Sequence, residues 1–178
     1  MRKEIFISVD IESSGPIPGV YSMLSLGACV VDSPESNFYV ELQPTSEAFI
    51  AEALRVTGFS LDQLKRIGRD PKVAMAEFKN WIIDQSADRT PVFVGFNAGF
   101  DWSFVNWYFH TYVGENPFGF APLDIKAYYM GYLGCSWAQT TSSQLRQEFR
   151  SDTPHTHNAL LDAKAQASIF AKLLKSRR

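Results

Sequence analysis

The sequence predicts an α/β domain built around a mixed β-sheet. Three strand-like segments come first and are separated by short turns, an order typical of an antiparallel meander. Segments with helical periodicity then alternate with two more strand-like segments, an order typical of α/β sheets in which helices connect successive strands. Because 178 residues are enough to bury one full hydrophobic core, we expect a single domain over residues 1–178.

Five segments have the composition of β-strands. EIFISVDIE, at about 4–12, is rich in β-branched residues. MLSLGACVV at 23–31 and NFYVELQP at 37–44 follow at short spacing, with DSPES predicted as the turn between them. TPVFVGF at 90–96 is typical of a buried strand, and APLDI at 121–125 of a short one. The prediction is therefore a central five-stranded sheet, antiparallel first and parallel afterwards.

The predicted helices alternate with the later strands. DPKVAMAEFKNWIID has the clearest pattern, because Asp70 suits the N-cap and Pro71 the first helical position. Ala74, Phe78 and Ile82 recur on one face of this helix. The helices are predicted over 47–56, 70–84, 99–114, 142–149 and 158–175.

Composition and charge are those of an ordinary globular protein. Apolar residues make up 46% and charged residues 20%, and the formal net charge is −2. A protein that neutralises phosphates along a long duplex is usually more basic, so we expect any bound nucleic acid to be short. No segment resembles a signal peptide or reaches the ~20 apolar residues of a membrane helix. We therefore expect a cytoplasmic protein without membrane contact, in which Cys29 and Cys135 are free thiols.

Two carboxylates lie close together near the end of the first strand. Asp10 and Glu12 are two residues apart, so their side chains point to the same face. The apolar residues before them indicate burial on both faces, where two carboxylates would repel each other and lose hydration. The alternative is that the strand has emerged from the sheet at this point and both side chains are solvated.

Two further carboxylates fall on apolar helix faces. Asp101 shares a face with Tyr108, away from the polar stripe of its helix, although a favourable interaction with the helix N-terminus is an alternative explanation. Asp162 falls between Ile169 and Leu173 on the last helix, whose lysines point the other way. A carboxylate on a buried face is costly unless it is paired or bound to a metal.

The four carboxylates together indicate a site for divalent cations. Carboxylate oxygens suit hard cations such as Mg²⁺ or Mn²⁺, and the sequence has no Cys/His cluster that would favour zinc. Acidic ligands with few basic partners suggest two metals, which can stabilise the attacking and leaving oxygens of a phosphodiester.

Three motifs in this order resemble those of the DEDDh family of 3′–5′ exonucleases. VDIES resembles the first exonuclease motif, and VGFNAGFDWSF resembles the second, with Asn97 four residues before Asp101. HNALLDA resembles the third, His-x-Ala-x-x-Asp, and supplies His157 and Asp162. The resemblance runs from residue 4 to about 172 and favours the branch of ribonuclease T and the polymerase proofreading subunits.

The resemblance implies a ribonuclease H-like fold. It also implies hydrolysis with two divalent cations, Mg²⁺ or Mn²⁺, that releases nucleoside 5′-monophosphates from a 3′ end of DNA or RNA. Carried over to this sequence, Asp10, Glu12 and Asp162 would hold the first cation, and Asp10 would also contact the second. Asp101 would act on a cation through water, and His157 would be the general base for the attacking water.

The chain departs from the family pattern at two positions. Phe96 stands where many members have His, and no predicted metal ligand is lost. Pro16 stands where members usually carry a large apolar residue that wedges against the terminal base, so Met23 or Phe100 is expected to take over part of that stacking. The residues expected to contact the substrate are Ser13, Ser14, Gly15, Pro16, Met23, Asn97 and Phe100.

The spacing within the third motif predicts where its residues lie. On a continuous helix, a separation of five residues would put His157 and Asp162 about 140° apart. We therefore expect His157 in the segment before the last helix, Asp162 in the first turns of that helix, and movement of the segment when metal and substrate bind. His155 fits no motif spacing and is predicted to be a loop residue, and Asp124 is predicted to be structural.

The expected partner is the 3′ end of a single-stranded nucleic acid. A homodimer contact through Trp102 or Phe109 is a further candidate. Two alternatives stay open beside the free-standing exonuclease: a proofreading subunit that acts when docked on a polymerase, and a non-catalytic nucleic-acid-binding module with the same fold. The five occupied catalytic positions argue against the non-catalytic module.

Overall fold

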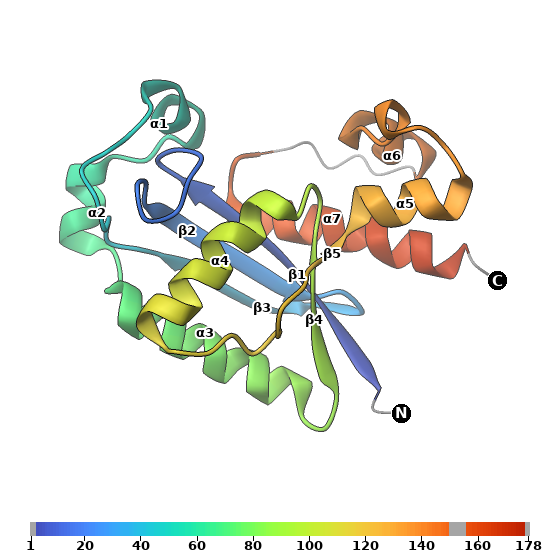
Figure 1. Ribbon diagram of the computed structural model, residues 1–178, viewed down its shortest axis with the longest axis horizontal. Coiled ribbons are helices and arrows are strands. Elements are labelled where there is room, and N and C mark those ends of the chain that lie inside the picture. The colour runs from blue at the N-terminus through green and yellow to red at the C-terminus, as the bar shows by residue number, and fades with distance from the viewer. Residues whose placement is uncertain (1–2, 150–155, 177–178) are drawn as a thin grey trace.

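The computed structural model has a five-stranded mixed sheet with helices on both faces (Figure 1). It describes residues 3–149 and 156–176, and no helix in these ranges is long and apolar enough to cross a membrane. The strands are β1 (Glu4–Ser13), β2 (Met23–Val30), β3 (Ser33–Glu41), β4 (Thr90–Gly95) and β5 (Leu123–Asp124). The helices are α1 (Ala51–Thr57), α2 (Leu61–Ile67), α3 (Pro71–Ser86), α4 (Gly99–Tyr112), α5 (Ile125–Leu133), the short 3₁₀ helix η1 (Trp137–Gln139), α6 (Ser142–Glu148) and α7 (Ala159–Lys175).

The strand order is β3-β2-β1-β4-β5. The first three strands form the predicted antiparallel meander, and β4 and β5 continue the sheet in parallel. The central strand, β1, pairs with β2 as far as Ser13 but with β4 only as far as Ser8. The last residues of β1 therefore have a neighbouring strand on one side only, and side chains from other elements can reach the open side.

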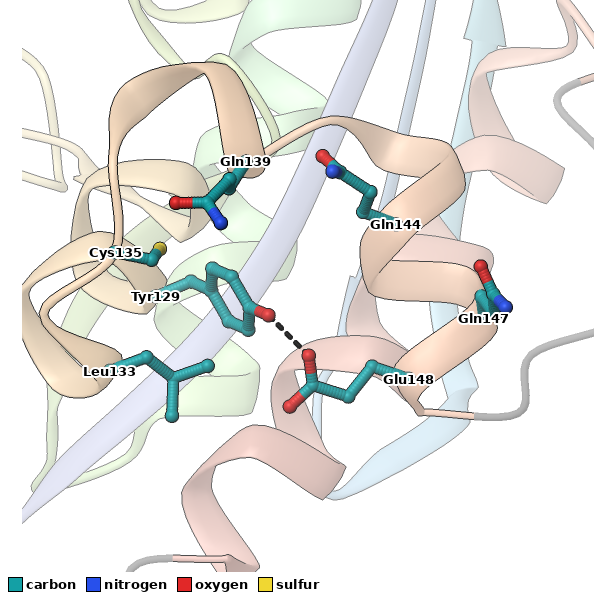
Figure 2. A pocket seen from close by; sticks show the side chains of 7 residues that line it. All are labelled: Tyr129, Leu133, Cys135, Gln139, Gln144, Gln147 and Glu148. Atoms are coloured by element: carbon teal, nitrogen blue, oxygen red, sulfur yellow. Dashed lines mark hydrogen bonds between the residues drawn. The ribbon is translucent and has the colours of Figure 1, made fainter.

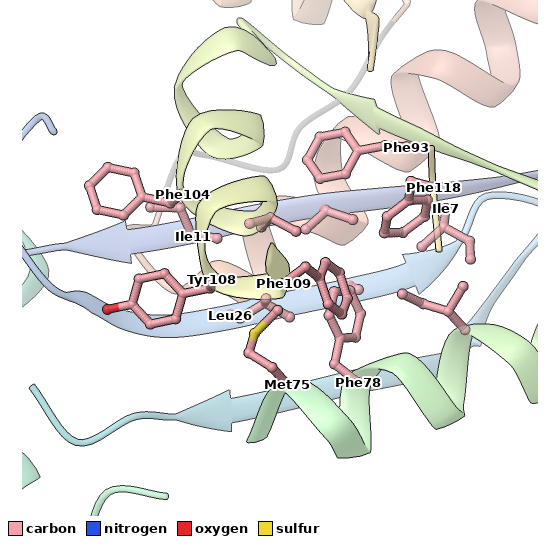
Figure 3. Packing of buried hydrophobic residues seen from close by; sticks show 14 of the residues in the cluster. Ile7, Ile11, Leu26, Met75, Phe78, Phe93, Phe104, Tyr108, Phe109 and Phe118 are labelled. Atoms are coloured by element: carbon pink, nitrogen blue, oxygen red, sulfur yellow. The ribbon is translucent and has the colours of Figure 1, made fainter. Parts of the chain in front are cut away.

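Helices α3 and α4 cover one face of the sheet with an aromatic core (Figure 3). Side chains of β1 such as Ile7 and Ile11 point into this core. Phe78 of α3 stacks on Phe109 of α4, with ring centroids 5.6 Å apart. Asp70 caps α3 by accepting two backbone N–H groups, as the sequence predicts.

Helix α7 covers the other face and approaches the sheet very closely. The Ser8 hydroxyl donates a hydrogen bond to the Ala163 carbonyl at 2.8 Å. A Cβ atom added to Gly27 would lie 2.2 Å from the backbone nitrogen of Leu160, so only glycine permits this approach. Because Gly27 pairs with Asp10, the close contact brings the first turn of α7 next to the end of β1.

The turn between β2 and β3 is shorter than predicted. It consists of residues 31 and 32, and Ser33 and Pro34 already belong to β3. An edge strand tolerates proline, because the missing N–H removes no hydrogen bond from the interior of the sheet. The predictions of DSPES as a turn and of a strand over 37–44 were therefore wrong in their boundaries, since β3 ends at Glu41.

Helix boundaries also differ between β3 and β4. The helix predicted over 47–56 begins later, as α1, because the backbone before it is used elsewhere: the Ile50 N–H donates to the Ser14 carbonyl at 2.8 Å. Helices α2 and α5 were not predicted. Both are short, so their apolar residues give little periodicity. The prediction of α7 over 158–175 is confirmed.

Candidate active site

Three carboxylates meet where β1 ends and α7 begins. One oxygen from each of Asp10, Glu12 and Asp162 lies within 4.8 Å of the others. Asp10 and Glu12 lie two residues apart on β1, and Asp162 lies in the first turn of α7. Glu12 is 8% exposed and Asp162 is 4% exposed. The alternative of a fully solvated acidic pair on β1 is therefore wrong.

The residues before α7 determine where this helix begins. Asn158 is the N-cap, and its side chain accepts the Leu161 N–H at 3.1 Å. His157 precedes the cap with φ of 54°, which is uncommon for a non-glycine residue, and it is exposed. Thr156 donates from its backbone nitrogen and its hydroxyl to Asp162 Oδ1, at 2.9 and 3.2 Å. His157 thus lies outside the helix and Asp162 inside its first turn, as their spacing predicts.

Asp101 reaches the same place from α4, on the opposite face of the sheet. Its Oδ1 accepts the Ile11 N–H at 3.0 Å, on the side of β1 that β4 leaves open. The side chain is 5% exposed and lies in the first turn of α4. This one carboxylate therefore completes the backbone hydrogen bonding of β1 and adds a fourth acidic group to the site.

Burial and mutual repulsion favour protonation of Asp10, Glu12 and Asp101. Burial raises the pKa of Asp10 well above its usual range, and Asp101, Glu12 and Asp162 raise it further, whereas the amide of Gln166 lowers it. Burial and the charge of Asp162 raise the pKa of Glu12 to about 7. Burial raises the pKa of Asp101 to about 8, against the lowering effect of its backbone hydrogen bonds. A bound cation would offset the same burial and repulsion without protonation.

Gln166 belongs to this site, although the sequence reasoning missed it. Its Nε2 donates to Asp10 Oδ1 at 2.9 Å, and its Oε1 accepts the Phe96 N–H. The side chain is 6% exposed. Gln166 therefore holds the Asp10 carboxylate in a fixed position relative to the end of β4. The available signal was its place four residues after Asp162, on the same helix face.

The carboxylates border a pocket of about 340 Å³. Two residues predicted to contact the substrate line it. Asn97 forms the turn before α4 with φ of 60°, a conformation that asparagine tolerates well. Phe100 is 37% exposed, which leaves part of its ring free for a base. The lining residues are Asp10, Ile11, Glu12, Phe96, Asn97, Phe100, Asp101 and Ser142.

Two of the predicted substrate contacts are inaccessible. Met23 is completely buried, and its backbone N–H donates to the Tyr108 hydroxyl at 2.8 Å. Ser14 is also completely buried, and its hydroxyl donates to the Ala48 carbonyl. Both residues anchor the loop after β1 and present no surface to a ligand. The predictions that Met23 stacks on a base and that the Ser14 side chain contacts substrate were therefore wrong.

The rest of that loop is only partly accessible. Ser13 is 6% exposed, and its hydroxyl donates to the carbonyl of Gly15, which is buried as well. Pro16 is exposed, as are the larger apolar side chains of Ile17 and Val20, which the sequence reasoning did not single out. Contact of Ser13, Gly15 and Pro16 with the substrate stays a prediction.

Three other sequence predictions concern Asp124, Phe109 and His155. Asp124 has a structural role, as predicted: its two carboxylate oxygens accept the backbone N–H groups of Ala98 and Ala127. Phe109 is completely buried, so the prediction of a dimer contact through it was wrong. His155 lies outside the described residues.

The donor set fits hard divalent cations. Within residues 3–149 and 156–176, the one group of metal-ligating side chains consists of Asp10, Glu12 and Asp162, all of which offer carboxylate oxygens. Such ligands suit Mg²⁺ and Mn²⁺ rather than zinc. The raised pKa values of Asp10 and Glu12 agree with this, because burial and the neighbouring carboxylates disfavour their charged forms, and a bound cation would favour them.

Comparison with known proteins agrees with this site. A family model described as an exonuclease, of the ribonuclease T type, matches residues 7–170. The chain is 54% identical over 169 residues to the 3′–5′ DNA exonuclease Cap18 of Escherichia coli, across 94% of this chain and 90% of that protein. The chain therefore belongs to this exonuclease family. The predicted identity as a 3′–5′ exonuclease is confirmed.

Solved structures share the fold at low sequence identity. The nuclease domain of 3′hExo, a DEDDh family member bound to rAMP, matches with a TM-score of 0.75 and 15% identity, over 98% of this chain and 93% of that one. Escherichia coli exonuclease I in complex with a dT13 oligonucleotide matches with a TM-score of 0.76 and 16% identity, over 98% of this chain but 42% of that one. The chain also spans 64% of a 3′-exonuclease that recognises a histone mRNA stem-loop. The predicted ribonuclease H-like fold is thus confirmed.

Proposed function

We propose that this protein removes nucleotides from the 3′ end of single-stranded DNA and releases nucleoside 5′-monophosphates. The observation that carries the proposal is the cluster of Asp10, Glu12 and Asp162, with Asp101 in the same pocket. DNA is proposed rather than RNA because the relative that is 54% identical is named a DNA exonuclease.

Two divalent cations, Mg²⁺ or Mn²⁺, are the proposed cofactors. The 4.8 Å spread of ligand oxygens supports one cation held jointly by Asp10, Glu12 and Asp162. Asp10 would also reach the second cation, and Asp101 would act through a bound water. The cations would supply charge stabilisation at the attacking and leaving oxygens of the phosphodiester.

The chain's own residues would orient the groups and move the proton. His157 would accept a proton from the attacking water, whose oxygen forms a bond to the terminal phosphorus. The bond between phosphorus and the 3′ oxygen of the next nucleotide breaks, and that oxygen leaves as a hydroxyl after taking a proton from solvent. Thr156 and Gln166 would hold Asp162 and Asp10 in place through the hydrogen bonds described above.

The first test is hydrolysis of the p-nitrophenyl ester of thymidine 5′-monophosphate in the presence of Mn²⁺. We expect release of p-nitrophenol that requires the metal and is lost in Asp10→Asn. Wild-type protein that is folded by circular dichroism but shows no turnover with metal would contradict the proposal. Matched single-stranded DNA, RNA and dinucleotides, assayed side by side, would then test the preference for DNA.

The remaining predictions about partners and location are proposals as well. Degradation of free single-stranded DNA without a polymerase would argue against action solely as a docked proofreading subunit. It would also exclude the non-catalytic module. A dimer contact through Trp102 can be tested by light scattering on the wild type and on Trp102→Ala. The cytoplasmic location stays a prediction.

A further inference from the structure

Phe96, Lys126 and Trp137 form an aromatic and cationic surface at the rim of the active-site pocket, which we call the Lys126 platform. The ammonium of Lys126 lies 4.1 Å from the ring centroid of Trp137 and 5.8 Å from that of Phe96. Phe96 lines the same pocket as Asp10 and Glu12. The platform is therefore continuous with the site of the carboxylates.

The fold holds Lys126 at this place. Helix α5 begins directly after β5, which runs parallel to β4, so its first turn lies at the edge of the sheet where the parallel strands end. Asp124 fixes that turn: Oδ1 accepts the Ala127 N–H at 2.8 Å, and Oδ2 accepts the Ala98 N–H at the start of α4. Lys126 lies between Asp124 and Ala127 in the sequence, so it belongs to the turn that Asp124 fixes.

Packing alone does not account for the Lys126 platform. Trp137 is 52% exposed, although indole rings are usually largely buried. Across residues 3–149 and 156–176, Lys126 forms no ion pair with a carboxylate, whereas Lys65 and Lys79 do. The platform thus presents an exposed aromatic ring and an ammonium that pairs with no carboxylate of the described part of the chain, beside a pocket rich in carboxylates.

We propose that the Lys126 platform binds the single strand just outside the metal centre. The ammonium of Lys126 pairs with a backbone phosphate, and the ring of Trp137 stacks on the neighbouring base. Proteins that bind single strands combine these two elements, positive charge along the backbone and aromatic rings beneath the bases. The inference rests on the proposed function, because it assigns a binding surface to the substrate of that site.

The neighbouring cavity is a less suitable path for the strand. It has a volume of about 560 Å³ and lies between α5, η1 and α6 (Figure 2). Glu148 lines it and accepts a hydrogen bond from the Tyr129 hydroxyl. The other polar side chains that line it are neutral glutamines. A carboxylate would repel a phosphate there, so the strand is expected to follow the side of η1 that carries Trp137.

The test compares a substrate that reaches the platform with one that does not. A single-stranded oligodeoxynucleotide extends beyond the metal centre, whereas the p-nitrophenyl ester of thymidine 5′-monophosphate contains one nucleotide. Trp137→Ala should lower kcat/KM for the oligodeoxynucleotide about tenfold more than kcat/KM for the ester, mainly through KM. Trp137→Phe should recover most of the loss, because it keeps an aromatic face.

Lys126→Met tests the charge separately. Loss of one phosphate contact should reduce the slope of log KM against log salt concentration by about 0.7 for the oligodeoxynucleotide. Lys72→Met is the control, because it removes one exposed charge from α3, which lies away from α5 (Figure 1). An equal loss on both substrates in Trp137→Ala, or an unchanged salt slope in Lys126→Met, would overturn the inference. Wild-type protein that cleaves neither substrate would instead contradict the proposed function.

Discussion

The two faces of the sheet differ in side-chain size where β1 ends. The face under α3 and α4 is filled with large rings such as Phe78 and Phe109, both completely buried. Near the end of β1, the face under α7 relies on small residues, above all Gly27 and Ala163, so the backbone of α7 lies almost against the strands there. Larger side chains such as Phe170 pack further along the helix. Large side chains fill space and stabilise the fold, whereas close backbone approach leaves room only for short functional groups such as the Asp10 carboxylate.

The alternation of β1 produces this difference. Its odd-numbered residues from Ile5 to Ile11 belong to the aromatic core, whereas Ser8, Asp10 and Glu12 point to the other face. A single strand therefore carries stability on one face and acidic groups on the other. Substitutions on the two faces should separate catalytic activity from the free energy of unfolding.

The largest expected effect on activity is that of Asp10→Asn. Loss of a carboxylate that serves both proposed cations should lower kcat by about a thousandfold or more, since metal stabilisation of the transition state amounts to several kcal/mol. In the metal-free protein at pH 8 the same change should raise Tm, because it removes repulsion from Asp101, Glu12 and Asp162. Steady-state kinetics and differential scanning calorimetry measure the two effects.

Phe78→Ala, on the aromatic face, is the matched control for that result. It should lower the free energy of unfolding by about 3–5 kcal/mol, while kcat per folded molecule stays unchanged. If Phe78→Ala lowered kcat as much as Asp10→Asn did, the separation between the two faces would be refuted.

Gly27→Ala tests the close approach of α7. The new methyl group would meet the backbone of Leu160 at 2.2 Å, so we expect α7 to shift and the free energy of unfolding to fall by about 2–3 kcal/mol. Activity should fall as well, because the shift moves Asp162 away from Asp10. Gly131→Ala is the control, since nothing lies within 4 Å of its added Cβ. Equal stability of the two variants in urea denaturation would show that the contact is unimportant.

Gln166→Met removes the hydrogen bonds of Gln166 but keeps much of its volume. Mutation of a residue that orients a metal ligand typically lowers metal affinity or activity by about 10–100-fold. We therefore expect the affinity of Gln166→Met for Mn²⁺ to fall by about 10-fold. Gln63→Met is the control, because Gln63 is exposed on α2. Isothermal titration with Mn²⁺ measures the difference, and wild-type affinity in Gln166→Met would mean that Asp10 needs no support.

The smallest expected effect is the pH dependence of the metal-free protein. The folded-state pKa is raised to about 7 for Glu12 and to about 8 for Asp101, so the folded state binds protons more tightly than the unfolded state does. The stabilisation is complete below about pH 4, near the ordinary pKa values, and is lost as the pH rises through 7 to 8. Tm should therefore be several degrees lower at pH 8 than at pH 5, and saturating Mg²⁺ should restore it at pH 8. An equal or higher metal-free Tm at pH 8 would contradict this.

The sequence was most informative where a pattern is local and long. The spacing of Asp10 and Glu12, the apolar arc around Asp162 and the N-cap Asp70 follow from the periods of strand and helix, and each lies where those periods place it. The position of His157 before α7 agrees with the angular separation between His157 and Asp162 that a continuous helix would impose.

Long-range contacts explain what the sequence did not reveal. Met23 and Ser14 were expected at the substrate, but partners far away in the sequence hold them inside the protein. Gln166 was overlooked because its role depends on Asp10 and on the end of β4. Likewise, nothing local in the sequence shows that Gly27 lies under the first turn of α7.

The most direct test of the proposed metal centre is a count of Mn²⁺ ions bound per chain, by titration with electron paramagnetic resonance detection in the presence of thymidine 5′-monophosphate. We expect two bound ions in the wild type and in Phe78→Leu, which alters the aromatic face. We expect a marked loss of binding in Asp10→Asn and Asp162→Asn. Equal binding by the wild type and the two Asp→Asn variants would show that the carboxylates under α7 are not the metal centre.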